Sequence, residues 1–131
     1  MPQLTFDHIH LRTPDPEAMA AWFETMLGAE VIRSMQQGAP RIDLKLGGQK
    51  IFLMPVAPGE KVNPAPVTPY QGLDHFGYFV KDIDAAYAEL KTKGAQFTQE
   101  LLSPRPGIKT LFLRGPQGVS VELLERDPKY R

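Results

Sequence analysis

Two histidines of this sequence recur in the same local context, and their spacing suits chemistry at a shared site. Asp7-His8 is repeated as Asp74-His75, a displacement of 67 positions. The chain has no cysteine, so it can form no disulfide, no thiolate metal site and no cysteine nucleophile. Any metal ion must therefore be held by nitrogen and oxygen ligands.

Further matches at fixed displacements show that the two dipeptides belong to an internal repeat, and a repeat changes the interpretation of the whole fold. The matches at 67 positions are Asp15 with Asp82, Ala18 with Ala85, Ala21 with Ala88 and Thr25 with Thr92. Gly28-Ala29 matches Gly94-Ala95 one position short of that register, and Gly48–Leu53 matches Gly118–Leu123 at a displacement of 70. The order of the matches is the same in both halves, which indicates two copies of one structural unit.

The first copy reads as a strand, a helix and three strands. Leu4–Thr13 alternates apolar and polar residues, and Glu17–Leu27 has apolar residues at helical spacing before Gly28. The remaining predicted strands are Glu30–Met35, Arg41–Leu46 and Gln49–Val56, with Gly47-Gly48 as a tight turn between the last two.

The second copy repeats this order after a connector. Residues 57–72 contain four prolines and little periodicity, so we expect a semi-rigid linker. The predicted elements that follow are a strand at Leu73–Val80, a helix at Ile83–Lys93, and strands at Gln96–Leu101, Lys109–Arg114 and Val119–Glu125. The sequence thus predicts an α+β fold of two βαβββ modules, about 4–56 and 73–126, in a single domain of 131 residues.

An Asp-His pair at the start of each module, and the final strand Gly-Val-Ser-Val-Glu-Leu, resemble the vicinal oxygen chelate superfamily. Its members include glyoxalase I, methylmalonyl-CoA epimerase, extradiol dioxygenases, fosfomycin-resistance transferases and metal-free bleomycin-binding proteins. The resemblance implies an open eight-stranded barrel-like sheet around a metal, with ligands from the first and last strand of each module. The corresponding positions here are His8, Phe52, His75 and Glu122.

Three of those four positions can bind a metal. Two imidazoles and one carboxylate, from His8, His75 and Glu122, suit one divalent ion; Fe(II) or Mn(II) is favoured, and Zn(II), Ni(II) or Co(II) would also fit. Phe52 can neither bind a metal nor move a proton. The resemblance to glyoxalase I implies a carboxylate at this position that does both, so a glyoxalase I mechanism would lack that group here. Asp43 lies on the neighbouring predicted strand, whereas Gln49 has the wrong strand parity to replace Phe52.

Strand alternation places other candidate residues near the predicted metal. His10 shares a face with His8 and is a candidate general base or a polar residue of the cavity. The predicted substrate-binding residues are Arg12, Phe52, Phe79 and Arg105, the last in a predicted loop at 103–107 where it would hold an anion or be exposed. Arg41, Asp43 and Lys45 either line the barrel, where they would meet an anionic substrate, or form a solvated rim.

We therefore predict a metal-dependent enzyme that binds a small molecule through adjacent oxygens. Of the possible reactions, dioxygenase-type chemistry is favoured. The alternatives are a glyoxalase-type lyase or isomerase and a non-catalytic resistance protein, although the latter generally lacks the metal triad. The formal net charge is zero and the basic residues are scattered, which disfavours nucleic acid. No segment suits a signal peptide or membrane span, so we expect a cytoplasmic protein. The connector permits pairing of modules between chains, and we expect a homodimer.

Overall fold

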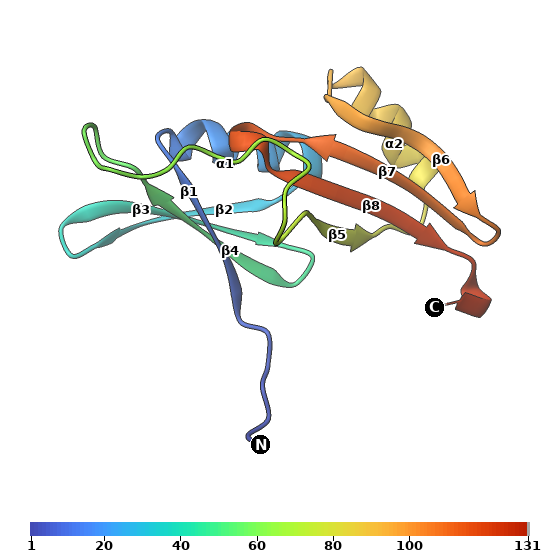
Figure 1. The fold of residues 1–131 in the computed structure, drawn as a ribbon, viewed down its shortest axis with the longest axis horizontal. Helices are drawn as coiled ribbons and strands as arrows, with labels where there is room; N and C mark the ends of the chain where they lie inside the picture. Colours follow the sequence, from blue (N-terminus) through green and yellow to red (C-terminus); the bar gives the residue numbers. More distant parts are fainter. Residues whose placement is uncertain (131) are drawn as a thin grey trace. The chain divides into compact units, whose positions relative to one another are not determined.

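The computed structural model describes residues 1–130, which form two compact units. The first unit ends at Asn63 and the second begins at Pro64 (Figure 1). This boundary falls inside the predicted connector, residues 57–72, which contains no helix or strand. We refer to the two units as module 1 and module 2.

Module 1 has the predicted βαβββ order. Its elements are β1 (His8–Thr13), α1 (Pro16–Leu27), β2 (Glu30–Gln36), β3 (Ala39–Leu46) and β4 (Gln49–Pro55). The sheet order is β1-β4-β3-β2, in which β1 and β4 are parallel and the other pairs are antiparallel.

Module 2 repeats this topology. Its elements are β5 (Phe76–Phe79), α2 (Ile83–Thr92), β6 (Phe97–Arg105), β7 (Ile108–Arg114) and β8 (Ser120–Arg126), with short 3₁₀ helices η1 (Pro116–Gly118) and η2 (Pro128–Tyr130). The sheet order β5-β8-β7-β6 is the exact counterpart of that in module 1. The predicted α+β class with two βαβββ modules is therefore confirmed, and the two mixed sheets are open.

The repeated Asp15 and Asp82 have the same local role, which is to begin a helix. Each side chain accepts a hydrogen bond from the backbone N–H three residues later, Ala18 at 3.0 Å and Ala85 at 3.1 Å. Such capping satisfies a donor that the first helical turn leaves unpaired. The repeat thus conserves the start of each helix in space as well as in sequence.

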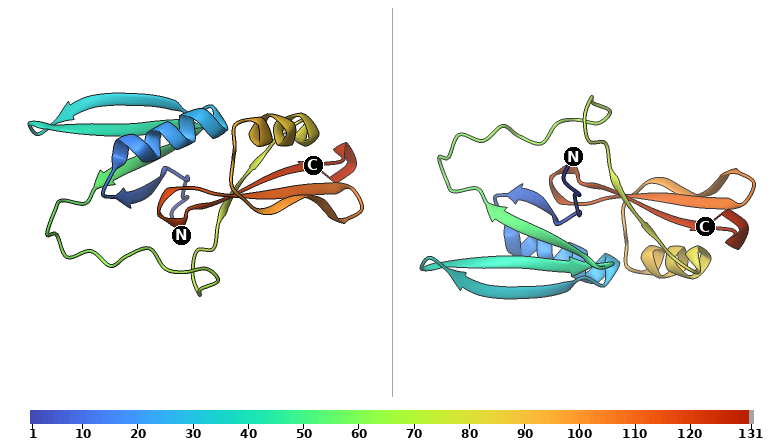
Figure 2. Two further views of the ribbon diagram at one scale, coloured as in Figure 1. Left: turned by 90° about the horizontal axis from the view of Figure 1, so that it is seen from above. Right: turned by 90° about the horizontal axis from the view of Figure 1, so that it is seen from below.

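Each module buries one face of its sheet beneath its own helix (Figure 2). In module 1 the buried side chains are Met19, Ala20 and Phe23 of α1 with Ile42, Leu44, Ile51 and Leu53 of the sheet. In module 2 they are Ile83 and Leu90 of α2 with Leu111, Leu113, Val121 and Leu123. Because side chains alternate along a strand, the polar residues between these positions are left on the opposite face. We call that second surface the open face of each module.

The bounds of three strands differ from the prediction by three residues or more, and the bounds of the other five by one or two. β1 begins at His8 rather than Leu4, because His8 pairs with Lys50 at the start of β4 and leaves residues 4–7 without a partner strand. β5 covers only Phe76–Phe79, so His75 directly precedes it. β6 continues to Arg105 and closes on Ile108, so the predicted loop at 103–107 shrinks to a turn at Pro106-Gly107.

No helix of the described chain combines the length and apolarity needed to cross a membrane.

Candidate metal centre

The open face of module 2 brings together His75 and Glu122. Glu122 lies in the middle of β8, opposite Gly77 of β5, and His75 lies two residues before Gly77. The His75 Nε2 atom is 3.2 Å from Glu122 Oε1, and the two side chains are 31% and 20% exposed. Gly77 has no side chain, so the Glu122 carboxylate has space beside β5.

The spacing of these two donor atoms fits two ligands of one ion. Nitrogen and oxygen ligands that each lie about 2.1 Å from a metal, at angles between octahedral and tetrahedral, are roughly 3.0–3.4 Å apart. His75 Nε2 and Glu122 Oε1 fall in this range at 3.2 Å. The distance, which is also that of a direct hydrogen bond between the two side chains, is therefore compatible with two ligands of one divalent cation.

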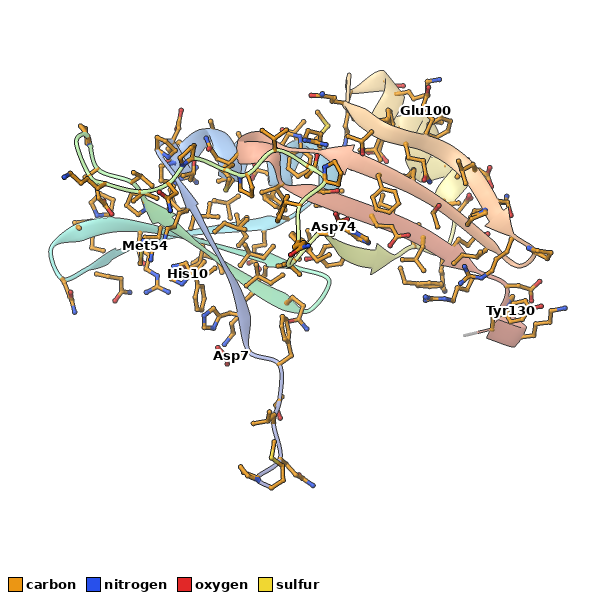
Figure 3. All side chains as sticks on the ribbon, viewed as in Figure 1. Asp7, His10, Met54, Asp74, Glu100 and Tyr130 are labelled. Atoms are coloured by element: carbon orange, nitrogen blue, oxygen red, sulfur yellow. The ribbon has the colours of Figure 1, made fainter. Side chains whose placement is uncertain are left out.

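An aspartate orients each of the two histidines. Asp7 Oδ2 lies 2.8 Å from His8 Nδ1, and Asp74 Oδ2 lies 2.7 Å from His75 Nδ1 (Figure 3 labels both aspartates). A carboxylate at Nδ1 favours the tautomer in which Nδ1 carries the proton, so Nε2 presents its lone pair to a metal. The hydrogen bond from His8 also lowers the pKa of Asp7, which keeps that carboxyl ionised.

On the open face of module 1, Phe52 occupies the position that corresponds to Glu122. Phe52 pairs with His10 of β1 and Asp43 of β3. Its ring stacks on the His8 ring with a centroid distance of 4.4 Å and an interplanar angle of 30°. Module 1 therefore places an aromatic ring directly against the predicted ligand His8.

Neither proposed substitute for Phe52 is set up as a ligand within module 1. Asp43 lies next to Phe52 on the open face, but both of its oxygens accept from Arg41 Nε, at 3.0 and 3.1 Å. Gln49 has the parity of the buried Ile51, as the strand pattern indicated. Of the four positions that correspond to ligands in the family, the one at Phe52 is therefore occupied by a phenyl ring.

His10 lies close to both His8 and Phe52. Its ring centroid is 5.8 Å from that of His8 and 5.9 Å from that of Phe52. Burial lowers the pKa of His10 below its ordinary value, and the positive charges of Arg12 and Arg41 nearby lower it further. The imidazole is consequently neutral at neutral pH and can accept a proton.

The predicted substrate-binding residues divide between the modules. Arg12 lies on the open face of module 1, where its Nη1 contacts Met54 Sδ at 2.8 Å. Phe79 lies on the same side of β5 as Gly77 and is 45% exposed. Arg105 lies apart from His75 and Glu122, at the end of the β6–β7 hairpin.

Arg105 instead borders a cavity of about 470 Å³ that is also lined by Arg126 and Tyr130. Its partner Ile108 is four residues along β7 from Phe112, the residue that pairs with Glu122. At about 3.3 Å per residue, this is roughly 13 Å from the Glu122 row. The structure therefore brings His8, His10, Arg12 and Phe52 together in module 1 and His75 with Glu122 in module 2.

Three residues with a clear part in this arrangement were not assigned one from the sequence. They are Asp7 and Asp74, which orient the histidines, and Phe112, whose ring meets that of His75 edge-on at 4.8 Å. For Arg41, which the sequence left between the barrel lining and a solvated rim, the structure places the guanidinium 4.8 Å from the Phe52 ring centroid. The repeated Asp-His dipeptide carried the signal for the two aspartates. The positions of Phe112 and Arg41 depend on strand register, which the sequence leaves undetermined.

A separate group of carboxylates, Asp82, Asp84 and Glu125, also brings three oxygens within 4.8 Å of one another. Each of them has a structural partner. Asp82 caps α2, Lys109 binds Asp84 at 2.7 Å, and Glu125 accepts from the backbone N–H of Ile83 at 3.1 Å. The three carboxylates therefore have structural roles at the start of α2, where they accept backbone hydrogen bonds or pair with a lysine.

Comparison with known sequences points to one family. A sequence model of the Glyoxalase/Bleomycin resistance protein/Dioxygenase superfamily matches residues 5–123. The ethylmalonyl-CoA/methylmalonyl-CoA epimerase of Cereibacter sphaeroides is 35% identical over 101 residues, which cover 69% of this chain and 71% of that protein. The uncharacterized protein YaeR of Escherichia coli is 29% identical over 126 residues, 91% of this chain and 94% of YaeR.

Comparison with solved structures supports the same architecture. A glyoxalase family protein from Bacillus cereus superposes with a TM-score of 0.77 at 16% identity and covers 97% of each chain. A glyoxylase/bleomycin resistance protein/dioxygenase domain from Frankia sp. gives 0.74 at 20% identity, covering 97% of this chain and 95% of that one. At these identities the likeness concerns the fold alone.

Proposed function

The chain belongs to the Glyoxalase/Bleomycin resistance protein/Dioxygenase superfamily, and from this premise we propose that it is a metal-dependent enzyme whose ligands are His8, His75 and Glu122. The observation that carries the proposal is the 3.2 Å approach of His75 Nε2 to Glu122 Oε1. Asp74 and Asp7 support it, because they direct the Nε2 lone pairs of the two histidines outward. Family members usually bind a divalent metal.

The ligand set favours Fe(II) or Mn(II), with Zn(II), Ni(II) or Co(II) also compatible. A bound ion of this kind would supply Lewis-acid activation of two neighbouring substrate oxygens or, as Fe(II), redox chemistry with O₂. Phe52 would pack against the substrate on the side of His8, and Arg12 and Phe79 are further proposed binding residues. Arg105 is a proposed contact only for a substrate long enough to reach the end of the β6–β7 hairpin.

Within this class we favour dioxygenase-type chemistry, because Phe52 supplies no ligand at the fourth corner. A set of two histidines and one carboxylate leaves several coordination positions for substrate and co-substrate. His10 lies near His8 and Phe52, where its imidazole would accept the proton of a substrate hydroxyl as that oxygen becomes a ligand. A catechol or an α-hydroxy carbonyl has the adjacent oxygens that this site requires.

A second candidate, an isomerase or lyase that moves a proton next to a carbonyl, is favoured by a different observation. The relative named ethylmalonyl-CoA/methylmalonyl-CoA epimerase is 35% identical to this chain. In this reaction His10 would carry the proton, since Phe52 replaces the second carboxylate. The two candidates differ in whether O₂ is consumed.

Metal analysis tests the ligand assignment. We expect the protein to bind one divalent ion. His75→Ala or Glu122→Ala should weaken metal affinity at least about 100-fold, because removal of a ligand should lower the affinity at least as much as removal of a residue that orients a ligand. Mass spectrometry of the metal content measures this. Asp84→Asn is the matched control, since it alters the carboxylate group at α2; metal loss in that variant instead of the other two would refute the assignment.

Two assays on anaerobically purified protein separate the reaction types. Uptake of O₂ with catechols would support the dioxygenase proposal. Exchange of a substrate α-proton with deuterated solvent, without O₂ uptake, would support the isomerase. Ligand binding with neither reaction would support a non-catalytic binding protein.

We also propose a homodimer, in which the connector allows a module of one chain to complete the site with a module of another. Residues 57–72 contain no helix or strand, so they are compatible with either pairing. Light scattering after size exclusion is expected to give twice the 14.6 kDa chain mass. A species of 14.6 kDa alone would contradict the dimer.

A further inference from the structure

Arg41 of β3 lies beside the predicted metal ligand of module 1, with Phe52 between them. The Phe52 ring centroid is 4.4 Å from that of His8 and 4.8 Å from the guanidinium carbon of Arg41. His8 pairs with Lys50, before Phe52 along β4, whereas Arg41 lies next to the residue that pairs with Leu53, beyond Phe52. His8 and Arg41 therefore flank Phe52 along the strand direction, and both contact its ring.

The guanidinium of Arg41 is held by only one of its nitrogens. Its Nε donates to both oxygens of Asp43, at 3.0 and 3.1 Å. An arginine has five N–H donors, so four remain on Nη1 and Nη2, and no hydrogen bond within residues 1–130 uses those atoms of Arg41. Contact with Phe52 and Asp43 orients the group before any ligand arrives, which lowers the entropic cost of binding.

The charge around Arg41 favours an anion. The open face of module 1 carries four cationic side chains, Arg12, Arg41, Lys45 and Lys50, against two acidic ones, Glu30 and Asp43, although the chain as a whole is neutral. A cavity of about 320 Å³ is lined by Arg41, Asp43, Lys45, Lys50 and Phe52. Its volume admits a small organic molecule, and its lining combines an aromatic surface with a cationic fork.

We propose that Arg41 binds a carboxylate of the substrate, and that the enzyme thereby selects small organic acids over neutral molecules with the same chelating oxygens. The terminal nitrogens of Arg41 match the two oxygens of a carboxylate. This inference rests on the proposed function, because His8 must hold the metal for Arg41 to lie beside the reacting part of the substrate. Asp43 would act as a positioning residue that fixes the guanidinium over Phe52.

The first experiment uses metal-free protein, so that it tests Arg41 independently of the metal. Titration with 3,4-dihydroxybenzoate is expected to shift the Nε–H NMR signal of Arg41 to saturation, whereas catechol, which lacks the carboxylate, leaves it unchanged. The signal of Arg33, which is paired with Glu17, serves as the internal reference. A signal of Arg41 that does not respond would overturn the proposal.

The second experiment measures affinity for the same two compounds by calorimetry with Zn(II)-loaded protein, in which no O₂ chemistry occurs. A charge-assisted contact predicts that 3,4-dihydroxybenzoate binds about tenfold more tightly than catechol. Arg41→Met should abolish this preference and Arg41→Lys should reduce it, because lysine keeps the charge and loses the fork. Arg33→Met removes a charge elsewhere in module 1 and should behave as the unaltered protein.

A preference for 3,4-dihydroxybenzoate that survives in Arg41→Met would refute the role of Arg41. If Arg41 responds in metal-free protein but Zn(II) improves the binding of neither compound, the carboxylate site stands and the proposed chelation of substrate at the metal fails. The two experiments thus separate the two proposals.

Discussion

The two modules share a topology and a helix cap, but the central row of the open face differs between them. In module 2 this row is Gly77, Glu122 and Phe112, and in module 1 it is His10, Phe52 and Asp43. Module 2 provides a carboxylate with space beside it. Module 1 provides a phenyl ring at the same point, flanked by His10, whose imidazole can accept a proton, and by Asp43, which is paired with Arg41.

The repeat thus preserves the residues that make each module fold and position a histidine. The residue in the middle of the last strand, Phe52 or Glu122, is what differs between the two modules. Asp15 and Asp82 cap the helices in the same way, and Asp7 and Asp74 orient the histidines in the same way. In the proposed function, module 2 supplies two of the three metal ligands and module 1 supplies most of the proposed substrate contacts.

Truncation of a buried leucine in either module should lower the free energy of unfolding, and a comparison of the two variants tests whether the two cores are alike. Leu44 of module 1 and Leu111 of module 2 are both fully buried, so Leu44→Ala and Leu111→Ala should each destabilise the protein by about 2–5 kcal/mol. Denaturant unfolding measures this. The single tryptophan, Trp22 in α1, reports on module 1, whereas circular dichroism reports on both modules.

We predict that the two probes give coincident transitions in both variants, as expected if the modules form a single domain. Leu111→Ala is the sharper test, because a separate module 2 would unfold early while Trp22 fluorescence stayed native. Such a split would contradict the single domain.

A smaller effect is expected from the aspartates that orient the histidines. Asp74→Ala and Asp7→Ala should each weaken metal binding about 10- to 100-fold, because the imidazole loses the partner that fixes its tautomer and ring orientation. Competition with a coloured chelator measures the affinity. Asn at either position keeps a hydrogen-bond acceptor and should fall between Ala and the native residue.

Equal losses at Asp7 and Asp74 would show that the two modules hold their histidines with equal effect. A loss at Asp74 alone would argue against His8 as a ligand, and His8→Ala would then decide the point by its own effect on metal affinity.

Replacing Phe52 by Glu gives module 1 the carboxylate that module 2 has. The new side chain would lie beside His8 and add a fourth ligand, so we expect about tenfold tighter metal binding together with a loss of any O₂ uptake. Phe52→Leu is the matched control, since it removes the stacked ring and adds no ligand. Equal metal affinity in the two variants would show that this corner lies outside the reach of the metal.

The sequence predicted the elements of both modules because their signals are local. Alternation, helical periodicity and the glycine turn at 47–48 require no knowledge of distant residues. The limits of β1 and β6 were wrong for the opposite reason. β1 begins only at His8, where β4 first offers a partner, and β6 continues through Arg105 because it pairs with Ile108.

The same distinction applies to the candidate site. The Asp-His repeat and the parity of Phe52 were readable from the chain, whereas the contact of Arg41 with Phe52 and Asp43 requires the register of β3 against β4. Arg105 shows the converse. Its loop was inferred from composition, but strand pairing places it roughly 13 Å along β7 from the Glu122 row.

The smallest expected effect concerns how each helix is tied to the outer strand of its sheet. In module 1, Arg33 of β2 donates to both oxygens of Glu17 at 3.1 and 2.8 Å, and in module 2 the Tyr87 hydroxyl donates to Glu100 of β6 at 2.5 Å. The hydrogen bond from Arg33 lowers the pKa of Glu17, and the one from Tyr87 lowers that of Glu100, both below the ordinary 4.5.

A carboxyl whose pKa is lower in the folded state stabilises that state above its unfolded pKa, and the contribution is lost as the pH falls through the folded pKa. Glu17→Gln and Glu100→Gln should therefore slightly lower the melting temperature at pH 7, with the difference vanishing below the ordinary carboxyl range. Both groups are exposed and each has a charged partner, Arg33 for Glu17 and Lys91 for Glu100, so salt should screen both effects. A double-mutant cycle with Arg33→Met isolates that pair, and a coupling that did not weaken with salt would show that the Glu17 contact is not chiefly electrostatic.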